Sequence, residues 1–164
     1  TNLHQSYTLE DLIVTAQQEL EVLFEYGFFT KGMREHLFFI LSEFESRISR
    51  LSRCICHGDL SDKNVMMTED QTTVLIDWED AFLGIEGYDY LYWLTFFNHR
   101  KFYSKEIFFR SGCEEDVIKG ILVTVLIIKS AISFYAGSYE NNSLTFQERI
   151  VEILKYLEIY DYDK

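Results

Sequence analysis

The chain has 164 residues, of which 48% are hydrophobic and 16% aromatic. This length and composition suffice for one folded domain with a real core, and they exclude a disordered chain. The net charge is −12, which argues against nucleic acid as a partner, because such binding depends on neutralising phosphates with Lys and Arg.

The first part of the chain predicts two helices. From Leu9 onward, apolar residues recur at helical spacing. Thr8 and Asp11 can cap the start of this helix, and Gly27 can end it. An apolar stripe over residues 33–51 predicts a second helix. Neither helix carries residues suited to chemistry, so we expect both to serve as scaffold.

Polar residues then gather around a predicted hairpin. Residues 56–64 read Cys-His-Gly-Asp-Leu-Ser-Asp-Lys-Asn, which places Asp59 and Asn64 on a polar loop. Two short strand candidates joined by a polar turn follow within residues 65–76. An antiparallel hairpin brings its open ends together. Asn64 and Asp77 should therefore lie side by side, with Asp59 on the loop just before them.

These side chains suit phosphoryl transfer. Mg²⁺ prefers oxygen ligands and takes only one or two carboxylates when it also binds phosphates. We therefore predict Asn64 and Asp77 as metal and nucleotide ligands, and Glu79 as a weaker metal candidate. Asp59 is placed to orient an acceptor hydroxyl and to take its proton, so we predict it as the catalytic base.

The rest of the chain is mostly helical in pattern. The glycines of residues 80–87 predict a loop. Thr145 and Glu148 form a capping box at the start of the last helix. Three more helices are predicted, at residues 88–97, 114–135 and 146–157. We expect the aromatic side chains of the first of these to belong to the core.

The motifs also resemble a known family. Residues 57–59 and Asn64 match the kinase pattern H-x-D-x-x-x-x-N, and the Asp-Trp-Glu at 77–79 stands where kinases carry Asp-Phe-Gly. The Gly after the His, the Asp-Trp-Glu, and the Gly-Tyr-Asp-Tyr-Leu at 87–91 are similar to the aminoglycoside phosphotransferase and choline kinase family. Three such blocks, in order and suitably spaced, are a specific signature.

The resemblance implies both a fold and a function. The fold would be the carboxy-terminal lobe of the protein-kinase-like fold, mainly α with a small β-hairpin, as one domain over residues 1–164. ATP and Mg²⁺ would be the cofactors, His57 would brace the loop, and Asp89 would steady it. Ser61 stands where protein kinases usually carry Lys, which favours a small hydroxyl compound as acceptor, such as an aminoglycoside, a choline-like amino alcohol or a sugar.

A complete kinase of this type has an amino-terminal lobe with a loop over the phosphates and a Lys paired with a Glu. The sequence contains no such loop and has no room for that lobe before Thr8. The chain also begins at Thr1 rather than Met. We therefore expect the natural protein to be longer, the missing lobe to be a partner of this one, and the isolated lobe to be inactive.

The cysteines and the apolar runs of the sequence predict the cellular location of the protein. Cys54 and Cys56 form a C-x-C without a second pair, which is not a zinc knuckle, so we expect small buried thiols in a reducing cytoplasm. The longest apolar run, residues 120–128, is too short to cross a bilayer, and no signal peptide is visible. We expect a cytoplasmic protein without a membrane partner.

Two alternatives remain open. A degenerate kinase-like binding module would also lack the amino-terminal lobe, although intact Asp59, Asn64 and Asp77 argue against decay. A metal-dependent phosphoesterase is suggested by the G-D-x-x-D at residues 58–62. That class also needs an upstream D-x-H and a downstream G-N-H, and the sequence has neither.

Overall fold

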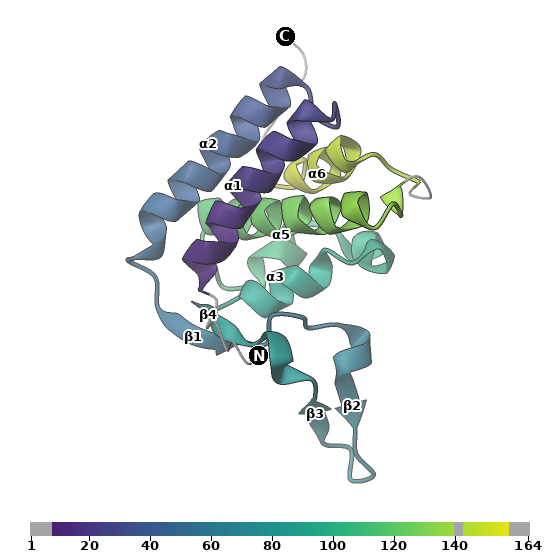
Figure 1. Ribbon diagram of the computed structural model, residues 1–164. Helices are drawn as coiled ribbons and strands as arrows, with labels where there is room; N and C mark the ends of the chain where they lie inside the picture. The colour runs from purple at the N-terminus through teal and green to yellow at the C-terminus, as the bar shows by residue number, and fades with distance from the viewer. Residues whose placement is uncertain (1–7, 140–142, 158–164) are drawn as a thin grey trace, which may run out of the picture.

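The computed structural model describes residues 8–139 and 143–157 (Figure 1). The helices are α1 (Leu9–Glu25), α2 (Lys31–Ile48), α3 (Tyr88–Leu94), α4 (Lys105–Phe109), α5 (Glu115–Tyr135) and α6 (Phe146–Leu154). The strands are β1 (Arg53–Cys56), β2 (Val65–Met67), β3 (Thr73–Leu75) and β4 (Phe82–Ile85), and short 3₁₀ helices are η1 (Asp62–Asn64), η2 (Trp78–Asp80) and η3 (Phe97–Phe102). This mainly helical fold with a small β component confirms the predicted fold class at that level.

The predicted helix caps are present. At the start of α1, the Asp11 amide donates to Thr8 Oγ1 (3.3 Å) and the Thr8 amide donates to Asp11 Oδ2 (2.9 Å). Thr145 and Glu148 make the same reciprocal pair at the start of α6. After α1, Gly27 adopts a φ of 81°, a left-handed conformation that favours glycine. These contacts satisfy backbone groups that a helix end leaves unpaired.

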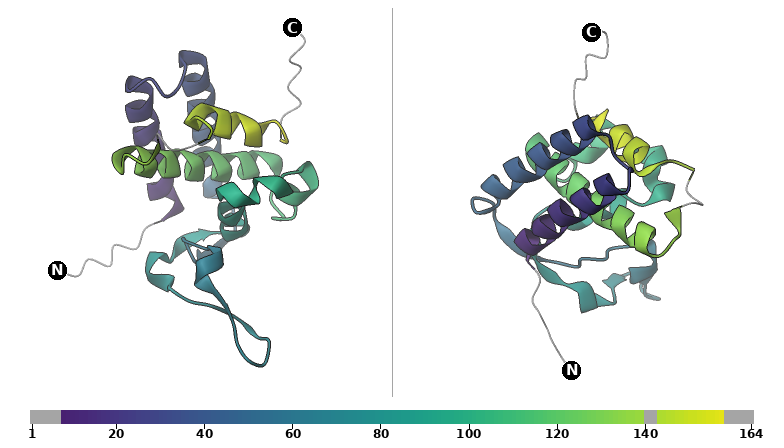
Figure 2. Two further views of the ribbon diagram at one scale, coloured as in Figure 1. Left: turned by 90° about the vertical axis from the view of Figure 1, so that its right-hand side faces the viewer. Right: turned by 45° about the horizontal axis from the view of Figure 1, so that its top comes forward.

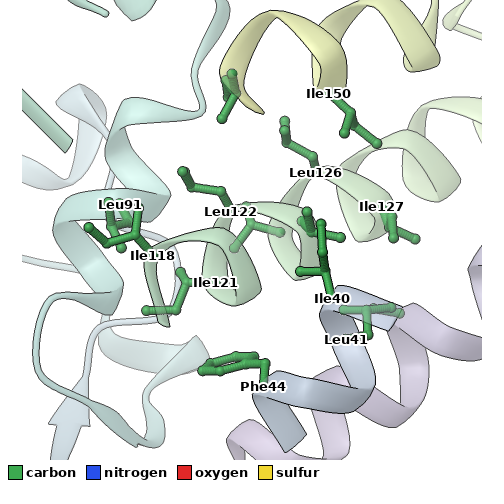
Figure 3. Close-up of a cluster of buried hydrophobic side chains, with 14 of the residues drawn as sticks. Ile40, Leu41, Phe44, Leu91, Ile118, Ile121, Leu122, Leu126, Ile127 and Ile150 are labelled. Carbon is green, nitrogen blue, oxygen red and sulfur yellow. The ribbon is translucent and has the colours of Figure 1, made fainter. Parts of the chain in front are cut away.

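The core is built around α5, which contacts α1, α2, α3, α4 and α6. Figure 3 shows its apolar side chains meeting those of α2, α3 and α6. The labelled members of this cluster are Ile40, Leu41, Phe44, Leu91, Ile118, Ile121, Leu122, Leu126, Ile127 and Ile150. A helix that is apolar on nearly every side needs neighbours on every side, and the surrounding helices provide them.

The helix α5 also bears on the membrane expectation. By length and composition it is the one helix in the described part of the chain that could cross a bilayer, so the shorter apolar run in the sequence understated its length. However, 67% of its most apolar window is buried inside the fold. That environment is typical of the core helix of a globular domain.

The predicted hairpin is confirmed. Strands β2 and β3 pair antiparallel, with Val65 opposite Leu75 and Met67 opposite Thr73. The ladder extends one step further, because the Ile76 amide donates to the Asn64 carbonyl at 3.0 Å. In Figures 1 and 2 the hairpin projects away from the helices. All the residues of both strands are exposed.

A second small sheet corrects the predicted loop at residues 80–87. Within that segment β4 is a strand, which pairs antiparallel with β1 and sets Cys54 opposite Gly84. A Cβ atom at Gly84 would lie 2.6 Å from Cys56 Sγ. This glycine therefore permits close packing inside a strand, a role that its sequence context does not distinguish from a loop.

The helix α3 is shorter than predicted and ends at Leu94. Thr95 Oγ1 donates to the Tyr92 carbonyl at 2.6 Å, and Phe96 then adopts an extended backbone. A Thr hydroxyl that bonds to the nearby backbone competes with continuation of the helix. The helix α6 likewise ends three residues before the predicted position, at Leu154.

Candidate active site

The loop between β1 and η1 is held by α3. Asp89, in the first turn of α3, accepts hydrogen bonds from the backbone amides of His57 (2.8 Å) and Gly58 (3.1 Å). Both carboxylate oxygens of Asp89 thus bind the loop. The N-cap position of α3 is occupied by Gly87 and not by Asp89. A carboxylate that accepts two backbone N–H groups fixes the entry of the chain into this loop.

The ring of His57 connects the loop to the hairpin. It is fully buried, and its Nε2 lies 2.8 Å from the carbonyl oxygen of Ile76. Because a carbonyl oxygen can only accept, Nε2 carries the proton of this hydrogen bond. The ring also packs against Trp78, with 4.8 Å between ring centroids. His57 therefore ties the loop to the residues on either side of Asp77.

The carboxylate of Asp59 has two polar neighbours. Tyr92 donates from its hydroxyl to Asp59 Oδ1 at 2.7 Å. Asn64 Nδ2 lies 3.4 Å from Asp59 Oδ2 and donates to the Asp59 carbonyl at 2.8 Å. Burial, the hydrogen bond to Asp59 and the negative charge of Asp59 together raise the pKa of Tyr92 above its ordinary range. The Tyr92 hydroxyl thus keeps its proton and remains a donor to Asp59.

Asn64 and Asp77 lie at the open end of the hairpin. The bond from the Ile76 amide to the Asn64 carbonyl holds the chain before Asp77 against Asn64. Asn64 directs its amide nitrogen to Asp59, which leaves its amide oxygen for another ligand. Asp77 is exposed, and within residues 8–139 and 143–157 nothing donates a hydrogen bond to its carboxylate. An amide oxygen and a carboxylate are a donor set that fits Mg²⁺.

The backbone of Asp77 adopts a left-handed conformation, with φ 64° and ψ 61°. Residues other than glycine rarely adopt it, although Asp tolerates it better than most, and such residues are concentrated at functional sites. The conformation is held from both sides. The preceding Ile76 accepts from His57, and the following Trp78 donates from Nε1 to the Leu75 carbonyl at 3.0 Å.

The other predicted acids differ in their surroundings. Glu79 is exposed in η2, close in the chain to Asp77. Asp62, the second acid of the G-D-x-x-D pattern, accepts from Trp93 Nε1 at 2.7 Å and faces His99 Nε2 at 3.4 Å. The side chain of Asp62 is thus bound by residues of α3 and η3. In addition, no group of three or more His, Cys, Asp and Glu side chains in the described residues is arranged to hold a metal.

The prediction that Tyr92 and Trp93 are core residues is confirmed in part, because both are partly buried and pack against the core. It missed that Tyr92 also donates to Asp59 in the loop and that Trp93 donates to Asp62 in η1. Their spacing from Asp89, three and four positions along α3, places all three side chains on one face of the helix. That spacing can be read from the sequence. The position of the loop relative to α3 cannot be read from it, because this position depends on tertiary packing.

Substitution of Gly58 by Ala is expected to disrupt this loop. Gly58 has a φ of 85°, and a Cβ atom there would lie 2.1 Å from the carbonyl oxygen of Asp80. Gly112 offers a matched control, since its φ is 77° and a Cβ would meet nothing within 4 Å. Both variants should lose about 1–2 kcal/mol of stability from backbone strain, and the contact with Asp80 should add to the loss in Gly58→Ala alone.

Only Gly58→Ala should also displace the loop and lower any turnover by about tenfold or more, because small displacements of catalytic groups are costly. Urea unfolding measures the stability of both variants, and ADP release by the full-length protein measures turnover. Equal behaviour of Gly58→Ala and Gly112→Ala would show that the contact with Asp80 does not matter.

Comparison with known proteins now identifies the class. A model of the phosphotransferase enzyme family (APH) matches residues 7–106, which is more than half of the chain and includes every site residue described above. The chain belongs to this phosphotransferase family, and the resemblance noted in its motifs is confirmed. Neither a curated protein nor a solved structure matches the chain.

Proposed function

We propose that this chain is the carboxy-terminal lobe of a protein-kinase-like phosphotransferase, which moves the γ-phosphoryl group of ATP to a hydroxyl group of a small molecule. The observation that carries the proposal is the grouping of Asp59, Asn64 and Asp77 at one end of the hairpin, in a chain that belongs to a phosphotransferase family. The place of Ser61 supports a small acceptor rather than a protein.

Each polar residue has a role in this proposal. Asp59 orients the acceptor hydroxyl and accepts its proton as the new bond to phosphorus forms. Asn64 and Asp77 would hold Mg²⁺, which supplies charge neutralisation at the phosphates when bound. His57 and Asp89 hold the loop that carries Asp59. Glu79 is proposed only as a further contact for the metal, through water.

The surface of the hairpin supports a missing partner lobe. The strand positions alternate between two faces of the hairpin, and both faces carry exposed apolar side chains. These exposed residues are Val65, Met66, Met67, Val74, Leu75, Ile76 and Trp78. A two-stranded hairpin is only marginally stable by itself. We propose that a nucleotide and an amino-terminal lobe of the same protein cover this surface.

The 164-residue chain alone is expected to bind ATP weakly and to show little or no turnover. Without a second lobe, the phosphates lack a covering loop and a lysine, and the hairpin remains open to water. Titration calorimetry with Mg-ATP measures this directly. Tight, magnesium-dependent binding of ATP by the isolated chain would contradict the proposed division into lobes.

The function is tested by screening hydroxyl compounds against the full-length protein, with ADP release as the signal. Aminoglycosides, amino alcohols and sugars form the first panel. We expect release with one acceptor class, dependence on Mg²⁺, and loss of release in an Asp77→Ala variant. Binding of an acceptor without ADP release under any condition would instead indicate a degenerate binding module.

A further inference from the structure

A lysine of α5, Lys129, contacts the ring of Tyr92, whose hydroxyl binds the proposed catalytic base. The reaction described above does not use this lysine. Lys129 is the last charged residue of α5, and its side chain points among aromatic groups. Its Nζ lies 3.8 Å from the ring centroid of Tyr92 and 3.7 Å from that of Phe96. Its one hydrogen bond in the described residues is to Thr95 Oγ1, at 2.8 Å. Two aromatic faces thus surround a cation.

The same Tyr92 ring connects this cation to the proposed base. The hydroxyl of Tyr92 donates to Asp59 Oδ1 at 2.7 Å, while its face contacts Lys129. A positive charge over the face of a phenol withdraws electron density, which makes its O–H a stronger donor. Lys129 therefore fixes the position of the ring and strengthens the hydrogen bond at its far end.

The charge on Lys129 responds to its surroundings. Burial and, to a smaller extent, the charge of Arg149 lower the pKa of Lys129, and the charge of Asp59 raises it, so that the pKa lies at about 7. The groups that face it are Tyr92 from α3, Arg149 from α6 and Asp59 from the loop. Arg149 donates to the carbonyl of Thr95, and Lys129 donates to the hydroxyl of the same residue, so both cations bind Thr95. The ammonium form dominates below this pKa, and the neutral amine dominates above it.

We propose that Lys129 and Tyr92 form a positioning pair for Asp59, in which the ammonium group holds the Tyr92 ring and the Tyr92 hydroxyl orients the carboxylate. The proposal rests on the function proposed above for Asp59. It adds that deprotonation of Lys129 loosens this orientation, so turnover depends on the charge of a residue that does not contact the substrate.

The first test uses the pH dependence of turnover in the full-length protein. For the wild type, kcat is expected to fall as pH rises through about 7, because the ammonium is lost. Tyr92→Phe keeps the ring and removes the hydroxyl, and Lys129→Met keeps the apolar stem and removes the charge. Each should lower kcat by about tenfold at pH 6.5, which is the effect of one hydrogen bond to a charged group. Each should also abolish the fall near pH 7.

A double variant and two controls separate this role from simple destabilisation. Because the two residues act in series, Tyr92→Phe with Lys129→Met should be no worse than Tyr92→Phe alone. Tyr90→Phe removes a hydroxyl of α3 that donates to the Ile107 carbonyl, and Lys119→Met removes a lysine of α5 paired with Glu115. Both controls should keep the wild-type pH profile. Wild-type kcat and pH profile in both single variants would overturn the proposal.

A second readout does not depend on activity. In full-length protein labelled with ¹³C-lysine, the pKa of Lys129 can be followed by NMR in the wild type and in Asp59→Asn. Removal of the opposing charge should lower the pKa of Lys129 by about half a unit or more. An unchanged pKa would overturn the positioning pair even if the protein is an active phosphotransferase. A lowered pKa in a protein that releases no ADP would instead leave the pair intact and refute the proposed function.

Discussion

Replacement of Asp59 by Asn in the full-length protein is expected to lower turnover by about 10²–10⁴-fold, the range for loss of general base catalysis. Asn has nearly the same shape and can still accept the hydrogen bond from Tyr92, but it cannot take a proton from the acceptor. ATP affinity should change little, since Asp59 is not among the proposed metal ligands. Measurement of kcat by ADP release and of ATP affinity by calorimetry separates the two quantities.

The contrasting variant is Asp77→Asn. It removes a proposed metal ligand, so ATP affinity in the presence of Mg²⁺ and turnover should fall together. If Asp59→Asn instead lowered ATP affinity as strongly as turnover, Asp59 would be a ligand of the nucleotide or its metal rather than the base.

Gly120→Ala is expected to lower the stability of the fold. Gly120 is buried in α5 at the contact with α2, where a Cβ atom would lie 2.2 Å from Phe44 Cγ and 2.5 Å from Phe44 Cβ. These atoms are at the root of the side chain, so relief requires the two helices to move apart. Overpacking of this kind costs about 1–3 kcal/mol, which exceeds the gain of about 0.5–1 kcal/mol in helix propensity.

Gly32→Ala is the matched control for that prediction. Gly32 lies in α2, is exposed, and a Cβ there would meet nothing within 4 Å. The propensity gain then acts alone, so stability should rise by up to about 1 kcal/mol. Urea unfolding of both variants gives the comparison. A stable Gly120→Ala protein would mean that α2 and α5 are not packed as closely as described.

Local sequence signals predicted the elements that depend on local chemistry. The start of α1 followed from Thr8 and Asp11, because a capping box is formed by residues three positions apart. The hairpin followed from two apolar runs and a polar turn. Asn64 and Asp77 could therefore be placed near each other from the sequence, since both belong to one hairpin.

Features that depend on contacts between distant segments were missed. Strand β4 was predicted as a loop because glycine is common in loops. In the structure, Gly84 instead leaves room for the side chain of Cys56 in the neighbouring strand. Tyr92 and Lys129 were not predicted to be near Asp59, because α3 and α5 reach the loop only through tertiary packing. A hydrophobic pattern identifies the buried face of a helix but not the polar atom that a tyrosine on that face contacts.

The most direct test is a crystal structure of the full-length protein with Mn²⁺ and a non-hydrolysable ATP analogue. We predict an anomalous peak within about 2.5 Å of both the amide oxygen of Asn64 and the carboxylate of Asp77, with the γ-phosphate on the side of Asp59. A metal bound by other residues, with the oxygens of Asn64 and Asp77 directed away from each other, would contradict the proposed site.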